Sequence, residues 1–237
     1  MSHGFQVIND NDFIQVDEKS SVYAVAFTGS TGTIAVDSPG SGFYRATVNL
    51  GSGNNLVNSL LCVRPASTWT TSAKKIWRGG LPGAAGQNVF IYSNNSASVD
   101  YFVMRDMKDV VSPAGTGYGI EVYDSTGSNV VYSSNKEVGK VHQTISVSPT
   151  TAGSFLYDNA SYDANIYGML NTTFWSNGVL NSGHHGPQLW FYKGSGSGSA
   201  SNYKMSVVHG LMFVASTQPA IDHSRTDRVF LSARRGV

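Results

Sequence analysis

Gly4-Phe5-Gln6-Val7-Ile8-Asn9 and Gly119-Ile120-Glu121-Val122-Tyr123-Asp124 alternate apolar and polar residues in the same way. Each stretch is followed by a polar, turn-rich gap and then by a second alternating stretch, Ile14-Gln15-Val16-Asp17 or Val130-Val131-Tyr132-Ser133. Alternation on both sides of a turn-rich gap is typical of a β-hairpin, whose loop tolerates insertion of a residue. We therefore interpret the two stretches as two copies of one hairpin.

The similarity between the two parts of the chain continues beyond the hairpins. The corresponding positions in the first and second copy are Val22 and Val138, Val25 and Val141, the segments 88–92 and 188–192 with Phe90 opposite Trp190, and Tyr101 and Tyr203. A repeat of this kind predicts a duplicated unit. The alternative is that unrelated amphipathic hairpins resemble one another, because strands use a small set of residue types.

The periodicity predicts an all-β fold. No segment has apolar residues at i, i+3, i+4 and i+7 over three turns, whereas short runs of Val, Ile, Tyr, Phe and Thr recur roughly every 8 to 12 residues. We expect two tandem β-sandwich-like domains related by the internal repeat, 1–112 and 113–216, followed by a C-terminal extension, 217–237. The Pro- and Gly-interrupted stretch 110–117 marks the boundary.

Strands are expected between clusters of Gly, Asn and Ser. In the first half they fall near residues 5–8, 13–16, 22–27, 32–36, 43–49, 59–64, 74–78, 88–92 and 100–104. In the second half they fall near residues 119–123, 129–133, 141–147, 154–157, 165–175, 179–181, 188–193, 203–209 and 211–215. Asn177-Gly178 between apolar flanks predicts a tight hairpin turn, because both residues accept positive φ.

The composition limits the kinds of partner. Charged residues make up only 13% of the chain and the formal net charge is +1, so there is no excess positive field to attract a nucleic acid or an anionic membrane. We expect neither nucleic-acid binding nor membrane insertion, since no stretch approaches the roughly 18 uncharged apolar residues that span a bilayer. The N-terminus has neither a basic nor a long apolar signal region, so we expect synthesis in a cytoplasm.

The single cysteine and the lack of catalytic motifs indicate no enzyme and no cofactor. Cys62 lies in an apolar run, where a thiol usually packs as a small hydrophobe, and one cysteine forms neither an intrachain disulfide nor a cysteine-based zinc site. The chain has no phosphate-binding loop, no Gly-x-Ser-x-Gly elbow and no His-Glu-x-x-His motif. A pair of carboxylates for glycoside cleavage is defined by separation in space, and the 15 acidic residues are scattered.

Four residues are candidates for contact with a receptor or a glycan. Trp69 and Tyr162 lie in polar, loop-like settings where an aromatic face stacks on sugar, although loop aromatics also fold back to cover a core. His184 and His185 are adjacent, and neighbouring residues on a strand point to opposite faces, so they chelate one metal ion only if a turn re-aims them. We expect such a turn at 182–187 and no metal site.

The second hairpin, from Tyr118-Gly119-Ile120 through Gly127 to Val130-Val131-Tyr132, resembles a segment of tail-associated virion proteins of tailed bacteriophages. The opening Gly-Phe-Gln-Val-Ile-Asn and the junction Val99-Asp100-Tyr101-Phe102-Val103-Met104 resemble the same family. The resemblance covers the hairpins and the junction and supplies no site residues. It implies a virion protein of the minor tail, tail-tip or receptor-binding type.

Three functions follow from these observations. The first is a structural component of a phage tail tip or baseplate that contributes to host attachment; it would be located in the virion and bind other tail proteins, copies of itself and a host surface glycan or protein. The absence of a collagen-like or heptad repeat favours a compact protein over a fibre shaft. The second is a carbohydrate-binding module or lectin, and the third is a glycan depolymerase.

The C-terminal segment is a candidate for contacts between subunits. Its apolar centre, around Phe230, is flanked by Arg225, Arg228 and Arg234. Such a segment suits a strand that adds to a sheet edge while its arginines reach the carboxylates of a partner. It could equally be the closing strand of its own domain.

Overall fold

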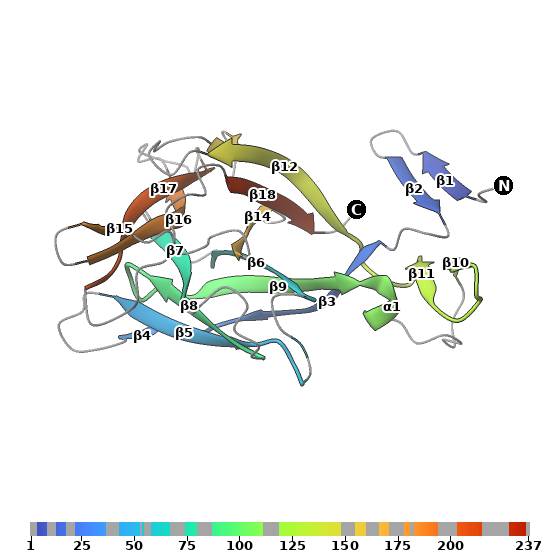
Figure 1. Ribbon diagram of the computed structural model, residues 1–237, viewed down its shortest axis with the longest axis horizontal. Helices are drawn as coiled ribbons and strands as arrows, with labels where there is room; N and C mark the ends of the chain where they lie inside the picture. Colours follow the sequence, from blue (N-terminus) through green and yellow to red (C-terminus); the bar gives the residue numbers. More distant parts are fainter. Residues whose placement is uncertain are drawn as a thin grey trace.

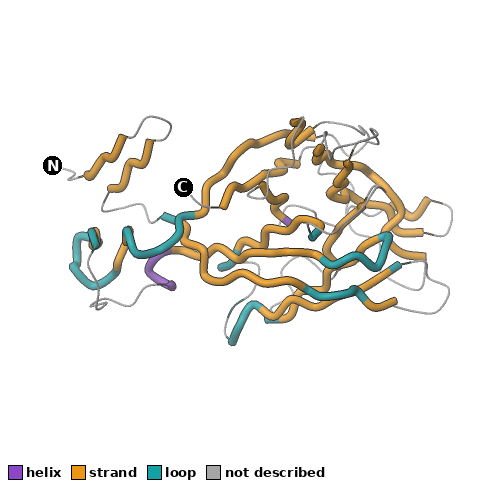
Figure 2. Tube along the Cα trace, turned by 180° about the vertical axis from the view of Figure 1, so that it is seen from behind, coloured by secondary structure: helices purple, strands orange, loops and turns teal. Residues whose placement is uncertain are grey.

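The computed structural model describes the greater part of the chain, in fifteen stretches. These are residues 4–8, 13–17, 22–36, 43–52, 54, 58–66, 74–79, 87–110, 119–147, 155–159, 166–170, 178–180, 183–193, 203–214 and 228–235. Strands dominate these residues, and the only α-helix among them is α1 (Met107–Val110) (Figure 2). The expected all-β fold is therefore confirmed.

Six strands form one antiparallel sheet (Figure 1). In spatial order they are β12 (Gly139–Val147), β18 (Arg228–Arg235), β14 (Ile166–Met169), β6 (Leu60–Pro65), β9 (Val99–Asp106) and β3 (Tyr23–Ser30). Three of these strands precede residue 112 and three follow it. Each group of three lies together.

Eight strands form a second antiparallel sheet. In spatial order they are β13 (Phe155–Asn159), β17 (Tyr203–Val214), β16 (Gly183–Lys193), β7 (Lys74–Gly79), β8 (Asn88–Ser93), β5 (Tyr44–Asn49) and β4 (Ala35–Val36), with β15 (Gly178–Leu180) also paired to β16. Strands from the two halves of the chain meet at β16 and β7, just as they meet at β14 and β6 in the first sheet. The expected boundary near residue 112 is therefore bridged by pairing in both sheets.

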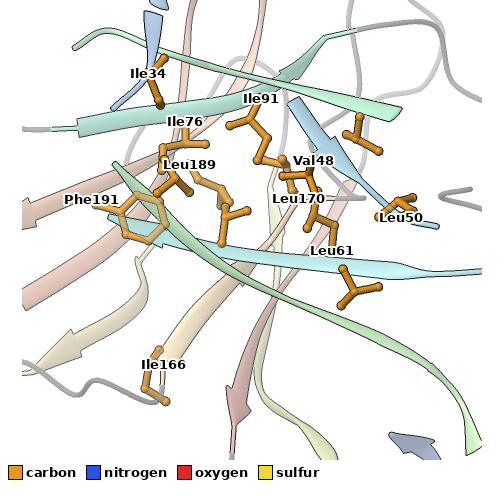
Figure 3. Packing of buried hydrophobic residues seen from close by; sticks show 14 residues of the cluster. Ile34, Val48, Leu50, Leu61, Ile76, Ile91, Ile166, Leu170, Leu189 and Phe191 are labelled. Atoms are coloured by element: carbon orange, nitrogen blue, oxygen red, sulfur yellow. The ribbon is translucent and has the colours of Figure 1, made fainter. Parts of the chain in front are cut away.

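One hydrophobic core lies between the two sheets (Figure 3). It contains Leu61 and Val103 from the six-stranded sheet and Ile76, Ile91 and Phe191 from the eight-stranded sheet, and each of these side chains is fully buried. Burial of one such side chain stabilises the fold by about 1.5–3 kcal/mol. The alternation of residues along each strand supplies these contacts, because every second side chain points to the same face.

A second cluster lies on the opposite face of the six-stranded sheet. Its members are Val25, Cys62, Phe102, Met104, Tyr167 and Met169. The sheet curls so that its two edge strands, β3 and β12, meet at the bridge between Ala24 and Val138. A Cβ atom on Gly139 would overlap the Met104 side chain, so β12 closes against this cluster on the concave side of the curl.

Four strands lie outside both sheets and form the two predicted hairpins. β1 (Gly4–Ile8) pairs with β2 (Phe13–Asp17), and β10 (Glu121–Tyr123) pairs with β11 (Val130–Ser133). Both pairs are antiparallel. Each hairpin leads along the chain into an edge strand of the six-stranded sheet, β3 or β12.

Several details differ from the expectations. The strands expected at 203–209 and 211–215 form one strand, β17, because pairing with β16 continues through Gly210. Gly178 opens β15 and pairs with His185, while Asn177 lies outside the described residues. The segment expected as an extension, 217–237, contains β18, which lies between β12 and β14 within the sheet.

Candidate functional site at the hairpin end

The loop of the β10–β11 hairpin is organised by one carboxylate. Asp124 Oδ1 accepts hydrogen bonds from the backbone N–H groups of Thr126 (3.2 Å), Ser128 (3.1 Å) and Asn129 (3.3 Å), and from Thr126 Oγ1 (2.7 Å). Asn129 Nδ2 donates to the other oxygen at 2.6 Å. Gly127, with φ of 69°, occupies the left-handed region that the turn requires. Donation from Thr126 and Asn129 holds the pKa of Asp124 well below its usual range.

The strands of this hairpin are tied together by a smaller polar cluster. Tyr123 Oη donates to Glu121 Oε2 at 2.7 Å, and Ser133 Oγ lies 3.5 Å from the other oxygen of the same carboxylate. Ser134 Oγ accepts from the N–H of Ile120 at 2.8 Å, and the N–H of Ser134 donates to Ile120 O at 2.9 Å. These bonds extend the pairing beyond the short strands, so the hairpin is held in one conformation at both ends.

A small separate core fixes the hairpin to the body of the protein. Ala24, Met107 and Val130 are fully buried and come from β3, α1 and β11. The backbone joins the same elements, since Val22 N–H donates to Val131 O (3.2 Å) and Met107 N–H donates to Val22 O (2.8 Å). The β10–β11 hairpin is therefore anchored to the chain just before β3.

The N-terminal hairpin lies at the same end of the molecule. Figure 1 shows β1, β2, β10 and β11 together, beyond the end of both large sheets. We call this region, with α1 and the first residues of β3, the hairpin end. Two of the large apolar residues that are exposed in the described chain lie here, Tyr23 (43% exposed) and Ile120 (53% exposed).

Two of the four candidate contact residues are placed by the structure. His184 and His185 lie in β16, where they pair with Phe213 and Leu211, and the register shifts between them. Both histidines lie within the strand β16, opposite a bulge in β17. The turn expected at 182–187 is therefore wrong at these residues. Trp69 and Tyr162 lie outside the described residues.

The candidate subunit-contact residues lie mainly in one internal strand. Arg228, Phe230 and Arg234 belong to β18, which pairs with β12 along its length and with β14 at Arg234. Pairing with β14 extends from Ser232 to Arg234, so over these residues β18 is an internal strand of the sheet. Arg225 lies outside the described residues.

An ion pair crosses the concave side of the six-stranded sheet. Arg64 and Asp100 are register partners on β6 and β9, with 3.2 Å between Nη2 and Oδ2. The Arg64 guanidinium carbon also lies 4.6 Å from the centre of the Tyr167 ring, on β14. With its side chain only 11% exposed, Arg64 links three adjacent strands beside the second apolar cluster.

Lys74 is a fully buried lysine on the face of β7 that contacts the core. Its Nζ donates to Ala97 O, in the loop between β8 and β9. Burial lowers the pKa of this amine to about 7. The signal in the sequence that could have indicated this burial is the position of Lys74 two residues before the core residue Ile76, on the same face of the strand.

Arg105 joins the two sheets near β5. Its guanidinium donates to Leu50 O, and Nε donates to Ser59 Oγ at 3.2 Å. Burial lowers the pKa of Arg105, and the nearby Asp109 carboxylate opposes the shift. These polar residues tie loops to strands.

Within the described stretches, no group of three or more His, Cys, Asp and Glu side chains lies close enough to hold a metal ion. None of the helical residues described forms a segment long and apolar enough to cross a membrane.

The comparisons give no relative from which a function could be transferred. No family model, no curated protein and no solved structure matches the chain. The hairpin end is therefore identified as the candidate site from its geometry alone.

Proposed function

We propose that this chain is a structural component of a bacteriophage tail tip or baseplate and contributes to host attachment. The observation that carries the proposal is the position of the two hairpins: both lie at one end, outside the large sheets, and each leads into an edge strand. These hairpins include the segments that resemble tail-associated virion proteins. A body of two packed sheets that presents two hairpins at one end suits attachment to a larger particle.

The proposal includes an organisation into two tandem β-sandwich-like units. In the six-stranded sheet, the order from the outside to the centre is β3, β9, β6 on one side and β12, β18, β14 on the other. In the eight-stranded sheet, it is β5, β8, β7 on one side and β13, β17, β16 on the other, with β4 added outside β5. In each half, strands that come in the same order along the chain occupy the same places in the two sheets, as β3 and β12 do. This correspondence supports an internal repeat.

Strand register supports the repeat independently. β3 begins its pairing with β9 at Tyr23 and Asp106, and β12 begins its pairing with β18 at Gly139 and Arg235. The bulge falls after the third residue of each strand, after Val25 in β3 and after Val141 in β12. Val25 and Val141 are the two residues that the sequence pattern matched, and bulges are retained features of a fold.

The repeat also changes one of the matches made from the sequence. In this alignment the counterpart of β8 is β17, and the counterpart of β7 is β16. The segments 88–92 and 188–192 then occupy different places in their units. Phe90 and Trp190 resemble each other because both lie in apolar strands of the same sheet.

Further parts of the proposal concern partners and location. We place the chain in the virion, in contact with other tail proteins and with copies of itself, and in contact with a host surface glycan or protein. We assign it no catalytic role, no cofactor, no nucleic acid and no insertion into a membrane. Lys74 and Asp124, two of the described residues with shifted pKa values, contribute to the fold in ways that need no substrate.

The experiment is to purify phage particles assembled from a genome that carries this coding sequence with a small C-terminal tag. Mass spectrometry should detect the chain in particles freed of soluble lysate proteins, and gold-labelled antibody should mark one end of the tail. Particles that lack the chain would exclude a virion component. A matched particle without the tag controls for non-specific labelling.

The alternatives are separated by assays on the purified chain. Binding to a glycan array without turnover would favour a lectin, and release of reducing sugar would favour a depolymerase. A discrete oligomer with neither activity supports the structural proposal.

A further inference from the structure

Charge is distributed unevenly along the chain although the formal net charge is only +1. The described residues of the two hairpins, their connections and α1, which are 4–8, 13–17, 107–110 and 119–137, contain five acidic residues and two basic residues. The acidic residues are Asp17, Asp109, Glu121, Asp124 and Glu137, and the basic residues are Lys108 and Lys136. The hairpin end is therefore acidic.

The strands of the eight-stranded sheet have the opposite balance. They contain six basic residues and one acidic residue, Asp158. The basic residues are Arg45, Lys74, Lys75, Arg78, Lys193 and Lys204. Lys74 is buried, which leaves five against one. In Figure 1 this sheet extends away from the hairpin end along the long axis of the molecule.

Several residues on the outer face of this basic sheet are at least partly exposed. Val89 and Ile91 belong to the core, so Phe90 between them faces outward, where it is 39% exposed. The Arg45 guanidinium carbon lies 5.2 Å from the centre of the Phe90 ring. Lys75 lies between the buried Lys74 and Ile76 and is half-buried on the same outer side. We call the surface around Arg45, Lys75 and Phe90 the basic face.

Exposed apolar residues occur on both surfaces. The large apolar residues that are exposed in the described part of the chain are Tyr23, Phe90 and Ile120. Two lie at the hairpin end and one lies on the basic face. An exposed apolar centre within a charged surround is typical of a protein interface, in which aromatic residues and Arg supply contact area and charge sets orientation.

We propose that the hairpin end of one copy docks on the basic face of a second copy, so that the chain self-associates head to tail. We choose a second copy as the partner because each chain carries both the acidic hairpin end and the basic face. This contact is heterologous, and it generates a ring if the rotation closes or a filament if it does not. It uses neither the backbone of β18 nor the arginines of the C-terminal segment, and it does not depend on the proposed tail function.

The test uses two charge-reversal variants of the full chain and one control. The hairpin variant is Asp17→Lys in β2 with Asp109→Lys in α1. The face variant is Arg45→Glu with Lys75→Glu. The control, Thr28→Lys with Ser30→Lys, adds positive charge at two exposed positions of β3. Circular dichroism and thermal melting select variants that fold as the wild type does.

Mass photometry and sedimentation then report association at about 20 mM and about 500 mM salt, which screens exposed charges strongly. The wild type and the control should associate at low salt and dissociate at high salt, and each interface variant should associate at least about tenfold more weakly. Mixing the two variants should restore heterodimers, since each retains one intact surface that fits the other.

Three outcomes would overturn the proposal. One is a wild-type chain that is monomeric at low salt. Another is an oligomer whose mass is the same in both interface variants. The last is equal binding of the wild type to an unrelated basic protein such as a lysozyme, which would show attraction by charge alone.

Discussion

Cys62 and Met169 lie directly opposite each other in the short antiparallel pairing between β6 and β14, and neither is more than 1% exposed. This pairing joins the two halves of the chain in the six-stranded sheet. In the proposed alignment of two units, Cys62 and Met169 occupy equivalent positions. The two halves of the chain therefore pair at equivalent residues. The single thiol of the protein therefore lies in the strand pair that joins the two halves.

Cys62 in the native protein should react very slowly with a thiol reagent. The side chain is fully buried, and burial raises the pKa of the thiol above its ordinary value, which lowers the fraction of reactive thiolate. We expect labelling at least about a hundredfold slower than in the unfolded chain. Stopped-flow absorbance with a disulfide reagent measures both rates, and Cys62→Ser gives the background. Equal rates in the two states would remove Cys62 from the core.

Lys74 should make stability rise with pH above neutrality. Its pKa in the folded state is about 7, below the ordinary lysine value of 10.5, so between these values the unfolded chain binds more protons than the folded chain. The free energy of unfolding therefore increases from about pH 7 towards pH 10 because of this group. Lys74→Met removes the titration. Urea unfolding at several pH values should show that the variant lacks this rise, and an identical pH dependence in both proteins would contradict the placement of Lys74.

Asp124→Ala should loosen the tip of the β10–β11 hairpin without unfolding the protein. The carboxylate accepts five hydrogen bonds within the loop, and Asp124 makes none of the contacts of the large sheets. Hydrogen exchange should accelerate at the amides of Ser128 and Asn129 and stay unchanged in β9. Ser125→Ala, at an exposed position of the same loop, is the matched control.

Acid should affect the same loop only at low pH. Because the folded-state pKa of Asp124 lies below its ordinary range, the ordering of the loop is present above the unfolded value and is lost as the pH falls through the folded value. Exchange at Ser128 that accelerates already near pH 5 in the wild type would be inconsistent with the carboxylate network.

Ala233→Pro should destabilise the protein strongly. Ala233 lies in β18 and pairs with Val141 on one side and Tyr167 on the other, so proline removes a ladder hydrogen bond in an internal strand. We expect the free energy of unfolding to fall by about 1–3 kcal/mol, the cost of leaving a buried hydrogen-bonding group without its partner. Ala35→Pro, in the edge strand β4, is the control and should cost less.

Deletion of 222–237 should likewise lower the melting temperature, and a truncated chain as stable as the wild type would show that β18 adds nothing to the fold.

Two fragments, 1–112 and 113–237, should copurify when they are expressed together with a tag on only one. β6 pairs with β14 and β7 pairs with β16, so separated halves would leave both sheets with unpaired central strands. Failure of the fragments to associate, with each one soluble and folded alone, would show two independent domains.

The sequence by itself determined the all-β fold and most strand positions. Strands such as β5 and β8 were predictable because every second residue faces one side of a sheet, so burial on that side leaves a period of two in the sequence. The two hairpins were predictable for the same reason, since their strands are adjacent in the chain and joined by turn residues.

Only the tertiary structure decided which strands pair over long distances. Nothing in Cys62 or Met169 specifies the other, because an apolar residue packs against many partners and the period of two recurs in every strand. The burial of Lys74 and the internal position of β18, which carries Arg228 and Arg234, likewise depend on contacts between segments far apart in the sequence. Local alternation fixes which face of a strand is apolar, but strand order depends on how all the apolar faces can be covered at once, and that is a property of the whole chain.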